Sequence, residues 1–157
     1  MSPEPAIVER WLRAALAAYS ESLAAAAARE PDPFRNPVGS RLRTQLAQLA
    51  GELLGGMDEQ VIERCCADIM AVRAVQDLTP ERALEFVFAP RRIVPEVAPD
   101  QAPADLEARI DRLALAAFRQ YLHQRTRLAE LRYEEQRRAL GPLPYRLRAP
   151  QPAAGDG

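Results

Sequence analysis

Lysine is absent from this 157-residue sequence, histidine occurs once, and aromatic residues make up only 6% of it. Strands favour aromatic and β-branched side chains, so their scarcity excludes a fold built mainly of β-sheet. The only two cysteines, Cys65 and Cys66, are neighbours, which excludes a framework of disulfides. Because all 21 basic residues are arginine, we attribute the missing lysine to the codon usage of a GC-rich bacterial genome rather than to arginine-specific chemistry.

The features that mark most enzymes and membrane proteins are also missing. The sequence has no glycine-rich phosphate loop, no nucleophile elbow and no catalytic spacing of His and Cys. Its one histidine, His123, lies among polar residues without a second ligand type nearby, so we expect neither a metal nor a cofactor. No uncharged run of about 18 apolar residues and no signal peptide occur. We therefore expect a non-enzymatic, cytoplasmic protein without a membrane span.

The sequence is rich in alanine, leucine and arginine, which are residues that favour helices. The length suits a single domain with a sizeable core. We predict an all-α fold, a single helical bundle of about five helices with a long projecting C-terminal helix. The helical domain should span residues 1–140, and the proline- and glycine-containing segment 141–157 should form a flexible tail.

Capping residues and apolar spacing predict where the helices begin and end. Asn36 and Pro37 are typical of the cap and first position of a helix, and Thr79 with Pro80 repeats this arrangement. Asp58 should cap another helix, directly after glycines that end the preceding one in the left-handed conformation. The predicted helices cover about 4–28, 37–54, 59–75, 80–94 with a bend or end near Pro90, and 104–140, and a proline-rich connector covers 95–103.

The last predicted helix is roughly 55 Å long, too long for the shorter helices to cover. Its apolar residues recur every three or four positions, so we expect the uncovered part to pack against another helix. Self-association into a homodimer is the leading interpretation. The residues expected to mediate this contact are Tyr121, Arg125, Leu128, Leu131 and Arg132.

Charge is distributed unevenly along the chain. Residues 1–118 hold 13 Arg and 18 acidic residues, whereas residues 119–148 hold eight Arg and three Glu. The basic segment, with two tyrosines between its arginines, would suit nucleic-acid phosphates. No helix-turn-helix pattern accompanies it, and its glutamates can pair locally with the arginines at helical spacing. We therefore expect a protein partner of unknown identity and no nucleic acid.

Polar residues gather at the ends of several predicted helices. They could form a buried polar clasp, with Arg73 near an arginine of the 32–43 corner, or line a ligand or partner site, and capping explains most of them. These residues are Arg35, Asn36, Arg41, Arg73, Gln76 and Asp77. Cys65 continues the apolar stripe of its own helix, so core packing is favoured over a redox switch for Cys65 and Cys66.

Three stretches carry a resemblance to a known family: “DPFRNPVGSRLR” at 32–43, “LLGGMDEQVI” at 53–62 and “IMAVRAVQDLTPERALEFVF” at 69–88. They resemble the N-terminal domain of the RsbT co-antagonist RsbRD family, as does the last predicted helix, so that the resemblance covers roughly residues 5–138. It implies a helical sensory or interaction module. In stressosome-type regulators such a domain precedes an output domain and modulates a serine/threonine kinase switch.

The sequence departs from that multidomain pattern after Leu140, where no output domain follows. We therefore expect a stand-alone member that does not control a kinase in cis, and the family supplies no catalytic residues to carry over. The leading expectation is a regulatory, sensory or adaptor protein that works through protein–protein interaction. One alternative is an accessory protein of a bacterial redox or sulfur-metabolism complex. The other is a small-molecule sensor with its ligand between helices near Arg35 and Arg73.

Overall fold

A computed structural model gives the fold and describes residues 2–19, 32, 34–76 and 78–141. All regular structure in these ranges is helical, which confirms the predicted all-α class. The elements in chain order are α1 (Glu4–Leu16), α3 (Pro37–Leu54), α4 (Glu59–Val75), α5 (Pro80–Leu84), the 3-10 helix η1 (Glu85–Phe88), α6 (Pro90–Val97), the 3-10 helix η2 (Pro99–Gln101) and α7 (Leu106–Leu140).

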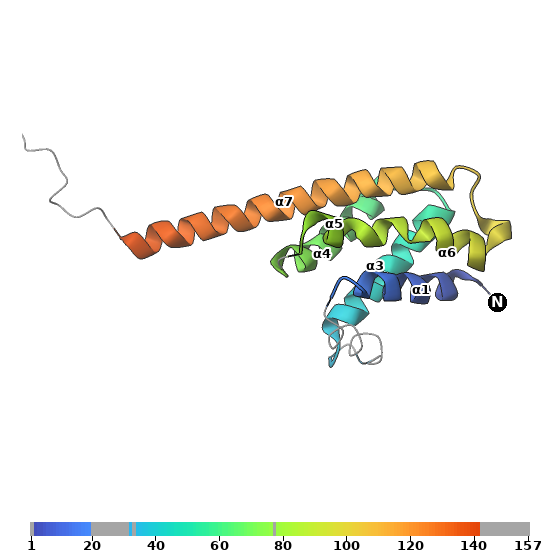
Figure 1. The fold of residues 1–157 in the computed structure, drawn as a ribbon, viewed down its shortest axis with the longest axis horizontal. Coiled ribbons are helices and arrows are strands. Elements are labelled where there is room, and N and C mark those ends of the chain that lie inside the picture. Colours follow the sequence, from blue (N-terminus) through green and yellow to red (C-terminus); the bar gives the residue numbers. More distant parts are fainter. Residues whose placement is uncertain (1, 20–31, 33, 77, 142–157) are drawn as a thin grey trace, which may run out of the picture.

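The helices pack around one hydrophobic core. In Figure 1, α1 lies at the base of the bundle, α3 runs across it, and α7 lies along the top and continues far beyond the other helices. The core receives a fully buried side chain from each of five elements: Trp11, Leu46, Met70, Val87 and Leu113. Burial of such apolar side chains is the main force that holds the bundle together.

The predicted beginnings of α3, α4 and α5 are confirmed. The side chain of Asn36 accepts a hydrogen bond from the amide of Gly39 at 2.8 Å, and Pro37 follows as the first helical residue. Asp58 accepts from the two amides at the start of α4, and Thr79 accepts from the amide of Arg82. These side chains satisfy amides that have no partner within the first turn of a helix.

The end of α3 differs from the prediction in one respect. Gly55 follows the helix, but its φ is −117°, and the left-handed residue is Met57 with a φ of 55°. The Met57 amide donates to the carbonyl of Glu52 at 3.2 Å, and the Met57 side chain is buried. Burial and this hydrogen bond offset the cost of a left-handed non-glycine residue.

The first helix is shorter than predicted, because α1 ends at Leu16. In a continued helix the carbonyl of Ala15 would accept from the amide of Tyr19. That carbonyl accepts instead from the buried side chain of Arg73, and the Tyr19 amide donates to Leu16 at 3.0 Å. A side chain from α4 thus ends α1, while the predicted continuation over 20–28 lies outside the described residues.

The bend or end predicted near Pro90 in the helix over 80–94 is confirmed, and the segment is divided further, into α5, η1 and α6. Pro90 has no amide hydrogen to donate to the carbonyl of Phe86, four residues earlier. The indole nitrogen of Trp11 donates to that carbonyl instead, at 2.8 Å. Beyond the break, α6 continues through Pro95 to Val97, so the connector to α7 begins at Ala98 rather than at residue 95.

The last helix confirms the predicted long, projecting element. α7 has 35 residues, which corresponds to about 52 Å. Its first half buries one face against the bundle through Leu106, Ile110, Leu113, Ala116, Ala117 and Tyr121. Beyond Tyr121 every side chain is exposed or half-buried. Within the ranges that the structure covers, no helix is both long and apolar enough to cross a membrane.

Candidate functional site

Arg73, in the last turn of α4, is a charged side chain at the centre of the core, with an exposed fraction of 0%. One guanidinium nitrogen donates to the carbonyl of Ala15 at 2.5 Å, and another donates to the carbonyl of Arg82 at 3.4 Å. The guanidinium carbon lies 4.7 Å from the ring centre of Phe86 and 5.3 Å from that of Tyr19. Arg73 therefore joins the ends of α1, α4 and α5.

Among the described residues, the groups that act on the charge of Arg73 include no carboxylate. Ring faces attract a guanidinium, and carbonyls at the end of α1 carry a negative partial charge. Burial still lowers the pKa of Arg73, and burial raises the pKa of the Tyr19 phenol although the charge of Arg73 opposes that rise. Within the described ranges, Nε of Arg73 and Oε1 of Gln76 are buried without a hydrogen-bond partner.

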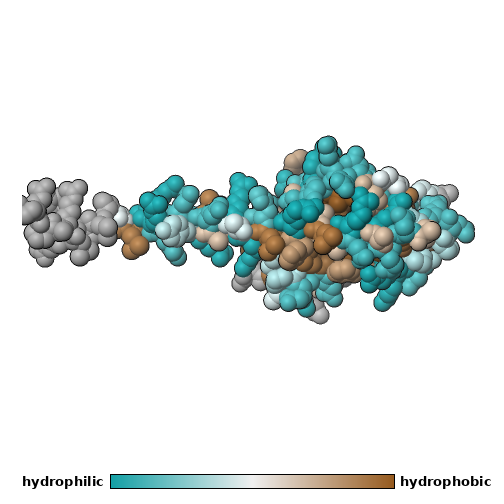
Figure 2. All heavy atoms as spheres, turned by 90° about the horizontal axis from the view of Figure 1, so that it is seen from above, coloured by the Kyte–Doolittle hydropathy of each residue, from teal (hydrophilic) through white to brown (hydrophobic). Residues whose placement is uncertain are grey.

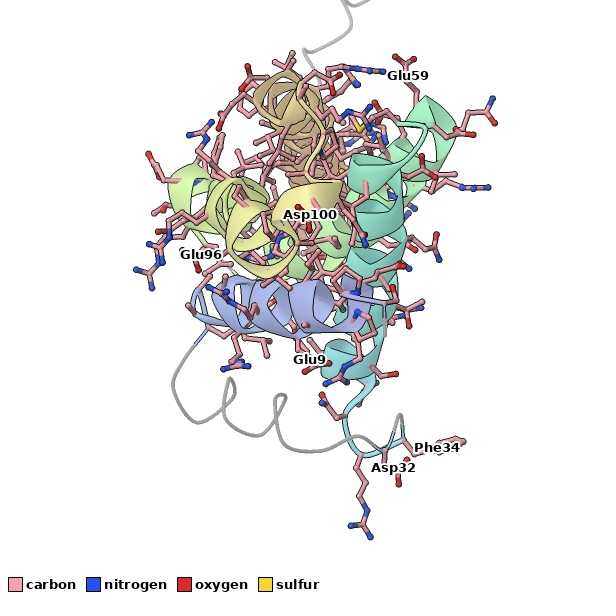
Figure 3. All side chains as sticks on the ribbon, turned by 90° about the vertical axis from the view of Figure 1, so that its right-hand side faces the viewer. Glu9, Asp32, Phe34, Glu59, Glu96 and Asp100 are labelled. Atoms are coloured by element: carbon pink, nitrogen blue, oxygen red, sulfur yellow. The ribbon has the colours of Figure 1, made fainter. Side chains whose placement is uncertain are left out.

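The predicted clasp between Arg73 and the 32–43 corner does not describe the contacts that Arg73 makes. Arg35 lies within 4.0 Å of Asp32, and 76% of its side chain is exposed. Arg41 is exposed beside a narrow pocket that Tyr19 also lines. Figure 3 shows Asp32 and Phe34 on a corner that points away from the bundle. The corner therefore launches α3 through Asn36, whereas Arg73 is bound within the core; Asp77 lies outside the described residues.

Both cysteines pack in the core. Burial raises the pKa of the Cys65 thiol to about 11 and that of the Cys66 thiol to about 12. The Cys65 thiol lies 3.5 Å from the amide oxygen of Gln48, to which it can donate. Since the thiolate is the reactive form, these values favour core packing over redox chemistry. Among the described residues, no group of three or more His, Cys, Asp or Glu side chains could hold a metal ion.

The predicted contact residues of the last helix divide into two groups. Tyr121 is buried in the bundle and its hydroxyl donates to the carbonyl of Leu78 at 3.4 Å, so it does not belong to a partner surface. Arg125 and Leu128 are half-buried, whereas Leu131 and Arg132 are exposed. The four residues beyond Tyr121 therefore continue the bundle-facing side of α7 outward, and we call them the inner seam of α7.

Three apolar side chains of α7 that the sequence analysis did not single out are exposed. Leu115 is 64% exposed, Phe118 44% and Leu122 49%. Their spacing of three and then four residues places them on one side of the helix. The spacing of these three exposed residues is visible in the sequence. The buried seam through Leu113 and Tyr121 runs along the same helix and is also apolar, so the sequence pattern does not distinguish the exposed residues from the buried ones.

A groove of about 780 Å³ lies beside these residues, between α4 and α7. Arg112 donates to Glu59 at 3.2 Å, and Arg119 forms an ion pair with Glu63 across it. Burial alone would raise the pKa of Glu63, but hydrogen bonds from Arg119 and Gln120 outweigh it and lower that pKa. The groove is therefore an apolar floor with paired charges along its rim, which is typical of a docking surface rather than of a catalytic centre.

The described chain thus offers two candidate sites, the buried Arg73 cluster and the uncovered surface of α7. The first is enclosed in the protein and leaves two buried polar atoms without hydrogen-bond partners among the described residues, while the second is open to another molecule. Comparison of the chain with protein-family models, with curated proteins and with solved structures gives no match.

Proposed function

We propose that this protein is a non-enzymatic regulatory or adaptor protein that acts through protein–protein contacts made by α7. The observation that carries the proposal is the length of α7, whose bundle-facing side runs on past Tyr121 into solvent. A helix that extends an apolar seam beyond its own core leaves that seam without a covering helix. The resemblance to co-antagonist sensor domains suits the same role.

The inner seam has the composition expected of a contact surface. Leu128 and Leu131 provide apolar area, and Arg125 and Arg132 flank it at helical spacing. Arginine is enriched in protein interfaces because its guanidinium can bind a carboxylate in two places while its stem packs on apolar atoms. A helix with an apolar stripe and acidic borders would complement this seam.

The bundle connects the core to the contact surface of α7. Arg73 ties three helix ends together, and α4 packs along α7, so a change of packing in the core would reach the projecting segment directly. A regulatory signal would then act by shifting α7 between arrangements that a partner distinguishes.

A capture experiment tests the proposal. The tagged full-length chain and a variant with Leu128→Asp and Leu131→Asp would be used to recover partners from the native host at low and high salt, with identification by mass spectrometry. We expect specific partners that the variant loses, since an aspartate in the seam leaves a buried charge unpaired. Recovery of an antagonist-domain protein or its kinase would support a stressosome-like role. Equal recovery by both chains would contradict a role for the inner seam.

One observation favours a second candidate, the small-molecule sensor. Arg73 Nε and Gln76 Oε1 are buried polar atoms without partners among the described residues, and a small ligand or water could satisfy them. A ligand-dependent rise in melting temperature that is lost in Arg73→Met would support it. The buried, protonated thiols give no support to the alternative of an accessory protein in a redox complex.

A further inference from the structure

α7 carries a second apolar stripe on a side that the bundle leaves exposed. Its large members are exposed by 64%, 44%, 49%, 62% and 84% in chain order. The stripe, which we call the outer face of α7, consists of Leu115, Phe118, Leu122, Ala129, Tyr133 and Leu140. Figure 2 shows hydrophobic residues gathered where the helix leaves the bundle and recurring along the projecting part.

Leu122 of the outer face and Leu131 of the inner seam lie on opposite sides of one helix, and Arg125 and Arg132 of the inner seam lie between the two sides. Leu122 and Leu131 are nine residues apart, which is two and a half turns at 3.6 residues per turn. Both side chains are 49% exposed. The bundle therefore cannot cover the outer face, and a helix that is apolar on two sides requires a partner on each.

Two pairs of outer-face residues are symmetric about a point between residues 127 and 128. Leu115 and Leu140 are equally far from this point, and so are Leu122 and Tyr133. A two-fold axis at that point, with the helices antiparallel, would place these two pairs of large apolar residues opposite each other, while Phe118 would face the side chain of Arg137 and Ala129 would face Thr126. Self-complementarity of this kind is what a symmetric dimer requires of its interface.

The charges of the chain favour the same orientation. The described projecting end carries Arg132, Arg137 and Arg138 against Glu134 and Glu135, a small positive excess, whereas residues 1–118 hold 18 acidic residues and 13 Arg. Parallel helices would bring two basic ends together, and like charges across an interface weaken it. Antiparallel helices instead bring each basic end alongside the acidic bundle of the other copy.

We propose that a second copy of this chain binds along the outer face of α7 in antiparallel orientation, with Leu115 opposite Leu140 and Leu122 opposite Tyr133. This inference rests on the proposed function and deepens it, since it assigns the two sides of α7 to different partners. The dimer covers the outer face over about 38 Å, while the inner seam stays accessible to the protein that the dimer regulates.

Leu122 and Leu131 provide a matched pair of variants. Leu122→Glu and Leu131→Glu make the same change at the same exposure on the same helix. Sedimentation equilibrium of the full chain should show a dimer for the unchanged protein and for Leu131→Glu. Leu122→Glu should weaken the dimer at least about tenfold, with helical content unchanged and, at concentrations at which both chains are monomeric, an unchanged melting temperature. A monomeric unchanged protein, equal dimerisation of both variants, or loss of the dimer only in Leu131→Glu would overturn the proposal.

A distance measurement between spin labels tests whether the two α7 helices are antiparallel. A spin label at Ala108→Cys, with Cys65 and Cys66 changed to alanine, should give an interlabel distance of about 60 Å in an antiparallel dimer. Parallel helices would place the labels within about 20 Å of each other, because packed helices lie 8–10 Å apart. Raising the salt concentration should weaken the antiparallel dimer, whereas strengthening by salt would indicate two basic ends held together and would overturn the assignment.

The two proposals can fail separately. If the chain is monomeric and still captures a partner through the inner seam, the dimer is excluded and the proposed function stands. If the dimer forms but capture at low and high salt recovers no partner that needs Leu128 and Leu131, the dimer through the outer face is supported and the proposed function is contradicted.

Discussion

The carbonyl of Ala15 and the guanidinium of Arg73, 58 residues apart in the sequence, are joined by a 2.5 Å hydrogen bond in the core. Because the Ala15 carbonyl accepts from Arg73 and not from an amide of its own helix, this bond connects the last turn of α1 to α4. The same guanidinium packs between the rings of Tyr19 and Phe86. One side chain thus determines where the first helix ends and how it sits on the bundle.

We expect Arg73→Ala to lower the free energy of unfolding by about 3 kcal/mol. The change leaves a cavity beside two rings and removes the donor for the buried carbonyl of Ala15 and for the partly buried carbonyl of Arg82. Urea denaturation followed by circular dichroism measures the effect. Arg41→Ala, at an exposed arginine, serves as the control and should stay within about 0.5 kcal/mol of the unchanged protein. Similar losses in both variants would show that Arg73 has no special structural role.

The buried thiols should make the fold sensitive to alkali. Cys65 and Cys66 titrate near 11 and 12 in the folded chain, whereas an exposed thiol titrates near about 8.5. Between about pH 9 and 11 the folded state binds more protons than the unfolded state, so the free energy of unfolding falls as the pH rises. Urea titrations across this range measure the slope, to which Tyr19 adds in the same direction.

The matched variant for this prediction carries Cys65→Ala and Cys66→Ala. Its stability should depend less steeply on pH above about 9, and a thiol reagent at neutral pH should label the unchanged chain slowly until denaturant is added. Rapid labelling of the folded chain would contradict the burial of the thiols.

The Asn36 cap of α3 should contribute about 1 kcal/mol to the free energy of unfolding. Asn36→Ala removes the acceptor for the Gly39 amide, while Asn36→Ser keeps an oxygen in the capping position and should recover most of the loss. Phe34→Ala, at a side chain that is 96% exposed, controls for changes at the same corner and should be neutral. A destabilised Phe34→Ala would reveal that the corner packs against something in solution.

Removal of residues 132–157 should leave the bundle intact. The described residues from 132 onward are exposed, so at concentrations at which the unchanged chain is monomeric their loss should change the free energy of unfolding by less than about 0.5 kcal/mol. Tyr121→Ala, at the last buried position, should cost about 3 kcal/mol. Thermal and urea unfolding of the two variants compare these effects, and an unstable truncated chain would show that the projecting segment supports the bundle.

Local signals in the sequence predict the helix beginnings well. Asn36, Asp58 and Thr79 each cap the helix that follows, because a cap depends only on residues within one turn. The length of α7 and its bundle-facing seam are likewise predictable, since both follow from spacing along one helix.

The errors arise where a distant residue supplies the deciding contact. Arg73 ends α1, so that boundary is not encoded locally. The break near Pro90 is visible in the sequence, and Trp11 accommodates it by donating to the carbonyl of Phe86. The contacts of Arg73 are likewise decided by distant residues, since its side chain is held by α1, α5 and η1 rather than by the 32–43 corner. The outer face of α7 was missed because its spacing runs alongside a stronger seam.

Tyr121 is the last residue of α7 whose side chain is buried, and the helix continues to Leu140. About 19 residues, or roughly 28 Å, of unbroken helix extend beyond this anchoring point. A stiff rod of that length is a lever, and a tilt of about 5° at Tyr121 displaces its tip by about 2.5 Å. A rearrangement within the core that moves atoms by a fraction of an ångström is therefore magnified at Leu140 to a step that a bound protein can distinguish.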